Sequence, residues 1–214
     1  MLLVEKNRWT ELAAIARARL GAAPWDAWAW LTLGLAMHRQ GGRPAATAAA
    51  FDSAFALLPT DERVRLDRLE RVVKPDDSTR IAKYDAATHS ALQRLYWMSA
   101  DPLWSREGNE PHIEFLARVT YAELRWTVEE MNVRGADTDR GDVHIRFGPA
   151  DFVMSLCAQY PSNCWAAFRP SPEQPQPMIR TIWTYANGFV FEFKGMPTFA
   201  TARIPPEGQQ WYGD

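Results

Sequence analysis

The first half of the fold is decided by residues 30–59, which read WLTLGLAMHRQGGRPAATAAAFDSAFALLP. Apolar residues recur at helical spacing on both sides of Gly41-Gly42, and Pro59 ends the second run. Two periodic runs with glycines between them predict a pair of packed helices. Small residues such as Gly34 and Ala54 allow the two backbones to approach closely.

The order of these residues resembles the tetratricopeptide repeat. The resemblance rests on Trp30, Leu33, Gly34, Met37, Gly41, Phe51, Ala54 and Pro59. The turn at Gly41-Gly42 is one residue longer than that repeat has, and residues 7–24 look like the second helix and exit proline of a preceding repeat. The resemblance implies antiparallel helical repeats over residues 1–74. A generic helical hairpin is the alternative.

Further helices are expected after this region. Their predicted ranges are residues 60–73, about 85–98 and about 110–131, each with apolar residues at helical spacing. Residues 74–77, Lys-Pro-Asp-Asp, are the best candidate for a linker, because a proline disfavours helix in the residue before it. We therefore place a domain boundary between residues 74 and 75.

The pattern changes to a period of two near the C-terminus. Residues 143–147 alternate between apolar and polar side chains and predict a strand with His144 on its polar face. Residues 181–185 and 189–194 predict a hairpin, because an Asn-Gly pair joins them. Residues 200–204 predict one more strand. The fold class is therefore α+β: N-terminal antiparallel helical repeats, a long helix and a small antiparallel sheet.

Residues 101–204 resemble the GWxTD domain, a bacterial domain of unassigned biochemical activity. That domain often accompanies tetratricopeptide repeats and often occurs in exported or envelope proteins. The resemblance rests on Asp101-Pro102, Asn109, Phe115, Arg118, Tyr121, Ala122, residues 135–141, residues 143–151, residues 182–185 and residues 189–191. Ala136 stands where the family has the tryptophan of its name. The resemblance implies a GWxTD-like α+β domain over residues 75–214.

The signature loop has a structural interpretation from its residues alone. Its candidate site residues are Gly135, Thr138, Asp139, Arg140, Gly141, Gly148, Pro149 and Asp151. The glycines permit tight turns, and Thr138 and Asp139 can cap backbone N–H groups. Arg140 can pair with Asp139, Asp142 or Asp151 across the turn. A structural or binding role is favoured; the alternative is an enzyme or ligand-binding domain whose site lies near this loop and includes His144.

Charge and hydropathy exclude several classes of protein. The chain has 214 residues, with 24 Lys plus Arg against 26 Asp plus Glu. This balance argues against a nucleic-acid partner. No stretch approaches the roughly 20 apolar residues of a transmembrane helix, and the N-terminus lacks the pattern of a signal peptide. The sequence as written predicts a cytoplasmic location, and an exported or envelope location if an upstream segment is missing.

Motifs for catalysis and for metal binding are not found in the sequence. The chain has neither a glycine-rich phosphate loop nor a nucleophile elbow, so no catalytic residues or cofactors are assigned. The acidic residues Asp137, Asp139, Asp142 and Asp151 come without the terminal glutamate of a calcium loop, so no metal is expected. Cys157 and Cys164 are separated by a turn-rich segment, and both a disulfide and two free thiols remain open.

Ten tryptophans are unusually many for a chain of this length. Trp9 and Trp30 are expected in the repeat core. Trp97, Trp104 and Trp126 are expected around the central helices, and Trp183 in the hairpin. The remaining four are candidate partner contacts: Trp25, Trp28, Trp165 and Trp211. Together these features predict a non-enzymatic protein-interaction or scaffold module that binds a protein partner or a copy of itself. The resemblance to the GWxTD domain implies that such a module either self-assembles or is a subunit of a larger cell-envelope complex.

Overall fold

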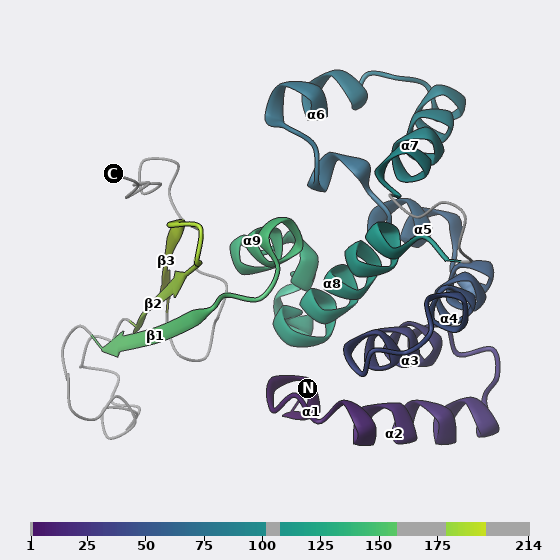
Figure 1. Cartoon of the computed structure of the whole chain (residues 1–214), viewed down its shortest axis with the longest axis horizontal. Helices are drawn as coiled ribbons and strands as arrows, with labels where there is room; N and C mark the ends of the chain where they lie inside the picture. Colours follow the sequence, from purple (N-terminus) through teal and green to yellow (C-terminus); the bar gives the residue numbers. More distant parts are fainter. Residues whose placement is uncertain (1, 102–107, 158–178, 196–214) are drawn as a thin grey trace. The chain divides into compact units, whose positions relative to one another are not determined.

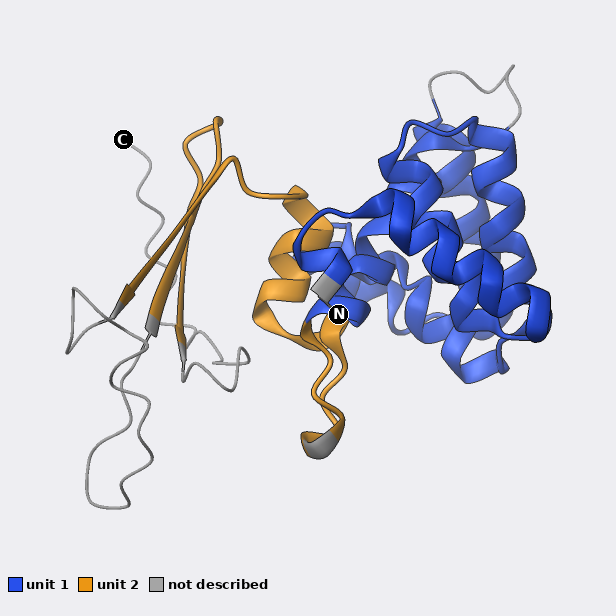
Figure 2. Ribbon diagram, turned by 90° about the horizontal axis from the view of Figure 1, so that it is seen from below, with its two compact units in different colours: residues 1–125 blue, residues 126–214 orange. Residues whose placement is uncertain are grey.

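The computed structural model describes residues 2–101, 108–157 and 179–195 (Figure 1). The chain forms two compact units, residues 1–125 and residues 126–214, coloured blue and orange in Figure 2. Each unit is described separately below. The predicted domain boundary between residues 74 and 75 stays a prediction. Within the described residues, no helix has the length and apolar character needed to cross a membrane.

Unit 1 is helical. Its helices are α1 (Leu2–Glu5), α2 (Trp9–Ala22), α3 (Ala27–Arg39), α4 (Pro44–Leu57), α5 (Thr60–Leu66), α6 (Pro75–Ile81), α7 (Ala86–Ala100) and α8 (Glu110–Trp126), and a short 3-10 turn covers Leu69–Arg71. The predicted helices of this region are present, but two are shorter than expected. The helix expected at residues 60–73 ends at Leu66, and the helix expected at about residues 110–131 ends at Trp126. The predicted linker at residues 74–77 instead begins α6, because Pro75 occupies the first helical turn, where a missing N–H costs nothing.

The first helices pack as consecutive neighbours, with α3 between α2 and α4. The side chain of Asp26 caps α3 by accepting a hydrogen bond from the Ala29 N–H at 3.1 Å. A Cβ atom on Gly34 would lie 2.9 Å from Cε1 of Phe51, so α3 and α4 approach closely at this glycine. The predicted close crossing is confirmed, whereas the resemblance to a tetratricopeptide repeat stays a prediction.

Two tryptophans that we expected in the repeat core are only half-buried. Trp9 lies beside Tyr121, with 6.4 Å between ring centroids. Trp30 donates its indole N–H to the carbonyl oxygen of Pro24 at 2.9 Å. The fully buried side chains of this region are instead aliphatic residues, Phe51 and Thr47.

The described part of unit 2 combines an α-helix with a small sheet. Its described elements are α9 (Asp139–Phe147), β1 (Phe152–Cys157), β2 (Ile179–Thr184), β3 (Val190–Gly195) and 3-10 turns at Glu129–Met131 and Gly135–Asp137. The described strands are antiparallel in the order β1-β2-β3. Trp183 on the central strand pairs with Val153 on one side and with Phe191 on the other.

The prediction of a strand at residues 143–147 is wrong, because these residues belong to α9. Thr138 caps the start of this helix, and Gly148, with a φ of +81°, follows its end. Val143, His144 and Ile145 are consecutive and all buried, which a half-exposed strand does not allow. His144 is therefore not on an exposed polar face; its ring centroid lies 5.5 Å from that of Trp126.

The predicted hairpin is confirmed. The backbone N–H of Tyr185 donates to the Phe189 oxygen at 2.9 Å, and Gly188 adopts a φ of +89° in the turn. Phe193 packs on Trp183 with 4.8 Å between ring centroids. Strand β1 was not predicted. The expected strand at residues 200–204 lies outside the described residues.

Candidate functional site

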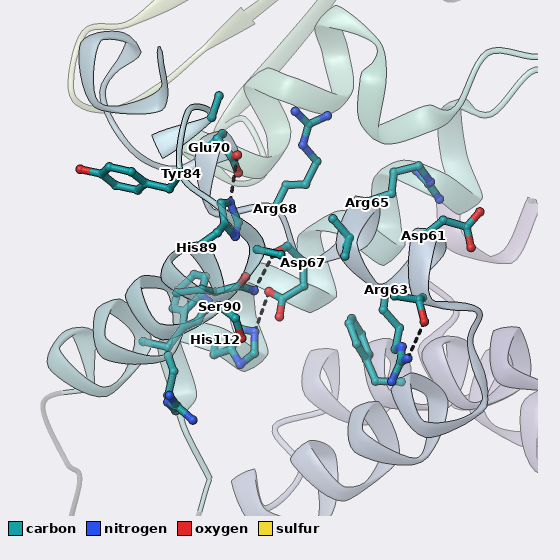
Figure 3. A pocket seen from close by; sticks show the side chains of 18 of the residues that line it. Asp61, Arg63, Arg65, Asp67, Arg68, Glu70, Tyr84, His89, Ser90 and His112 are labelled. Atoms are coloured by element: carbon teal, nitrogen blue, oxygen red, sulfur yellow. Dashed lines mark hydrogen bonds and ion pairs between the residues drawn. The ribbon is translucent and has the colours of Figure 1, made fainter. Parts of the chain in front are cut away.

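A cleft of about 1490 Å³ opens on unit 1 (Figure 3). Its walls come from α5, from the 3-10 turn at residues 69–71 and the residues before it, and from α7. Asn109 and His112, at the start of α8, complete it. These segments are far apart in sequence, so only the folded unit assembles the cleft.

Helix α7 supplies most of one wall. Asp85 caps the helix by accepting a hydrogen bond from the Thr88 N–H at 2.9 Å. His89, Gln93 and Trp97 follow at intervals of four residues, which places them on one face of the helix, and all three line the cleft. Their regular spacing is the signal in the sequence that identifies this face.

Two histidine–carboxylate pairs connect the walls. Nε2 of His89 lies 3.0 Å from Oε1 of Glu70, and Nε2 of His112 lies 2.9 Å from Oδ1 of Asp67. Figure 3 shows both pairs as dashed lines. Gln93 also donates to the backbone oxygen of Asp67 at 2.6 Å. The segment from Asp67 to Glu70 is therefore tied to both α7 and α8.

Aromatic stacking fixes the floor of the cleft. The ring of His112 stacks on the indole of Trp97 with 4.6 Å between centroids and 23° between ring planes. Asn109 donates to the backbone oxygen of Trp97 at 2.6 Å and accepts from the His112 N–H at 2.9 Å. Trp97 is buried, so it positions its neighbours as part of a rigid base.

Neighbouring charges and hydrogen bonds in the walls of the cleft stabilise the charged forms of Glu70 and Arg65. Burial raises the pKa of Glu70, but hydrogen bonds from its own backbone N–H and from His89, together with the nearby charges of His89 and Arg68, lower it overall. Arg65 pairs with Glu62 at 2.9 Å and with the buried carboxylate of Glu123 at 2.6 Å. Within the described residues, no group of three or more His, Cys, Asp or Glu side chains has an arrangement that holds a metal ion.

The signature loop lies in unit 2, and its contacts are those of a structural turn. Thr138 Oγ1 accepts from the Gly141 N–H at 3.0 Å and donates to the Gly135 oxygen at 2.7 Å. Arg140 donates to Thr181 Oγ1 at 3.2 Å, and its guanidinium carbon lies 5.4 Å from the centre of the Phe193 ring. The first part of the signature thus joins α9 to the sheet.

The second part of the signature holds the hairpin turn. Asp151 accepts from the backbone N–H of Ala186 at 2.6 Å. The hydroxyl of Tyr185 donates to the Gly148 oxygen at 3.0 Å. Of the other candidate residues, Pro149 is exposed and Asp139 is half-buried in the first turn of α9. These contacts favour the structural interpretation of the loop.

Of the candidate tryptophans, the two that the structure describes, Trp25 and Trp28, do not line the cleft. Trp25, 71% exposed, precedes the cap of α3, and Trp28 is half-buried on that helix. Trp104, Trp165, Trp211 and Cys164 lie outside the described residues. Cys157 is the last residue of β1. The predicted disulfide between Cys157 and Cys164 and the predicted contacts of Trp165 and Trp211 therefore stay predictions.

The sequence did not identify the residues that line the cleft. The histidines and arginines of α5, α7 and α8 carry no motif, and their partners come from an irregular turn. No family model, no curated protein and no solved structure matches this chain, so the resemblances to the tetratricopeptide repeat and to the GWxTD domain stay predictions.

Proposed function

We propose that this protein is a non-enzymatic protein-interaction module whose cleft receives a segment of a partner protein. One observation carries the proposal. Val64 and Met98 line the cleft and are 60% and 64% exposed. Large apolar side chains that line a concave surface and remain in water are typical of interaction sites.

The rigid walls support the same proposal. His89 and His112 hold Glu70 and Asp67 in place, and Trp97 braces the floor. A preformed surface loses little conformational entropy on binding, which raises affinity. The resemblance to the GWxTD domain adds the proposal that the module is a scaffold subunit of a larger complex at the bacterial cell envelope.

The test of the proposed function uses a random peptide library and the variant Met98→Glu. We expect the full chain to enrich peptides whose affinity falls at least about tenfold in this variant, because a carboxylate replaces an apolar contact in the cleft. Fluorescence anisotropy with the enriched peptides measures the change.

The matched control is Leu95→Glu. Leu95 is exposed on the same helix, 61%, but does not line the cleft, so this variant should bind as the unchanged chain does. The proposed function is wrong if no peptide is enriched, or if both variants bind as tightly as the unchanged chain.

Strand β1 supports a second candidate function, self-association. Phe152 and Val153 point to opposite faces of the sheet and are 62% and 53% exposed. Among the described strands, β1 pairs with β2 alone. Residues 152–157 contain neither charge nor proline, the features that usually protect an edge strand, and antiparallel pairing with a second copy places no like charges opposite each other.

The variant Met154→Lys tests this pairing. We expect light scattering across a dilution series to detect a reversible dimer of the unchanged chain, and the lysine to raise its dissociation constant at least about tenfold, because a charge protects the edge. Leu95→Lys, at an exposed apolar position in unit 1, should leave the dimer intact. A strictly monomeric unchanged chain excludes self-association.

A further inference from the structure

The carboxylates of the cleft are mostly engaged within the protein. Asp67 and Glu70 face His112 and His89. Asp61 is the remaining carboxylate that lines the cleft, and it is exposed. Two of these three acidic side chains therefore have cationic or hydrogen-bonding partners already.

The arginines of the cleft are differently placed. Arg65 is held by Glu62 and Glu123, but Arg63 donates to the hydroxyl of Thr60 at 2.9 Å and has no carboxylate partner in the described part of the chain. Arg68 and Arg94 are exposed, and neither forms an ion pair among the described residues. Three guanidinium groups thus lack an ion-pair partner among the described residues, although the charge of Arg68 also acts on Glu70. Asp61 is the exposed carboxylate beside them, since Asp67 and Glu70 face histidines.

These charges border an apolar surface. Val64 stands on α5 between Arg63 and Arg65, and Met98 follows Arg94 by one turn of α7. Tyr84, 43% exposed, adds an aromatic ring to the lining. A ligand that fits must therefore combine negative charge with apolar groups.

We infer that the cleft binds an acidic, amphipathic segment of a partner protein. The carboxylates of that segment pair with Arg63, Arg68 and Arg94, and its apolar side chains pack on Val64 and Met98. This inference rests on the proposed function and names the chemistry of the partner. A nucleic acid fits less well, because its affinity comes from many phosphate contacts, whereas this cleft offers three arginines beside apolar side chains.

The experiment uses the full chain and three labelled peptides of about 15 residues, long enough to form a helix on binding. One peptide carries leucines at helical spacing with glutamates between them, and in the other two glutamine or lysine replaces every glutamate. By fluorescence anisotropy we expect the glutamate peptide to bind at least about fivefold more tightly than the glutamine peptide. Salt should reduce this difference, because the arginines are exposed.

The variant Arg94→Glu should bind the glutamate peptide about fivefold more weakly than the unchanged chain does, and should bind the lysine peptide more tightly. The matched control is Arg17→Glu, since Arg17 is likewise exposed in the interior of a helix, α2, but lies outside the cleft. It should change neither affinity. Equal effects of the two variants would overturn the inference, because they would indicate a general effect of charge.

The other outcomes separate the inference from the proposed function. If the lysine or glutamine peptide binds as well as the glutamate peptide, and loses affinity with Met98→Glu, the proposed function stands and the acidic partner is wrong. If none of the three peptides binds, the inference is wrong, and the library selection decides the proposed function separately. Displacement of the glutamate peptide by a single-stranded RNA oligonucleotide at lower concentration would also overturn the inference.

Discussion

Replacing Gly141 with alanine is expected to lower the local stability of unit 2 by about 3 kcal/mol or more. A Cβ atom at this position would lie 2.1 Å from the carbonyl oxygen of Gly135 and 3.0 Å from Cα of Ala136. Both neighbours are backbone atoms of the turn that leads into α9, so neither can rotate away. The turn or the helix must shift.

Close packing and helix propensity predict opposite effects of Gly141→Ala on stability. Gly141 lies in the first turns of α9, where alanine normally stabilises a helix by about 1 kcal/mol relative to glycine. Its N–H donates to Thr138 Oγ1, the cap of the helix. A shift that relieves the contact with Gly135 also disturbs this capping bond, so the packing cost outweighs the propensity gain.

Hydrogen exchange measured by mass spectrometry is the suitable readout, because it reports on each unit separately. We expect the amides of α9 to exchange roughly a hundredfold faster in Gly141→Ala. The control is Gly21→Ala in α2, where an added Cβ meets no atom within 4 Å, and a gain of about 0.5 to 1 kcal/mol is expected. Unchanged exchange of α9 would contradict the close approach of Gly135.

Local signals predicted the hairpin of unit 2 correctly, because few dipeptides other than Asn-Gly allow its turn. Thr138 was expected to cap backbone N–H groups of a turn; its hydroxyl does accept such a hydrogen bond, but at the start of α9, a helix that was not predicted. The strand at residues 143–147 was wrong for a physical reason. Alternation over five residues does not distinguish a strand from a short helix that is buried on most sides, as α9 is.

The cleft could not be predicted from the sequence. The spacing of His89, Gln93 and Trp97 marks one face of a helix, but a core face has the same spacing. Glu70, the partner of His89, and Asp67, the partner of Gln93, lie outside any periodic element and are 19 and 26 residues away. The carboxylates of Asp67 and Glu70 meet the histidines only when the helices pack together. The same packing places the arginines at the cleft.

The second large effect is expected at Glu114, which links α8 to α3. Burial raises the pKa of its carboxyl group, but hydrogen bonds from His38 and Arg118 and the charges of Arg118 and Arg39 outweigh burial and lower the pKa to about 2. A carboxylate with a lowered pKa stabilises the fold above its unfolded value of 4.5. That contribution is lost as the pH falls from about 4.5 toward 2.

We therefore expect Glu114→Gln to lower the free energy of unfolding of unit 1 by about 2 to 3 kcal/mol at pH 7. More than half of this difference from the unchanged chain should disappear by about pH 3. At that pH the carboxyl group is protonated in the unfolded chain, where its pKa is 4.5, but still largely ionised in the folded chain, so folding must release a proton. Urea titrations at several pH values, followed by far-ultraviolet circular dichroism of the helices, measure the difference.

The control for this prediction is Glu11→Gln. Glu11 pairs with Arg8 on the surface, where an ion pair contributes at most about 1 kcal/mol. A loss at Glu114 that stays the same from pH 7 to pH 3 would show that the amide disturbs packing rather than charge. The alternative result is a loss of stability that becomes smaller at acid pH in Glu114→Gln but not in Glu11→Gln. It would mean that the carboxylate of Glu114 on α8, paired with His38 of α3, stabilises this part of the helical unit above pH 4.5.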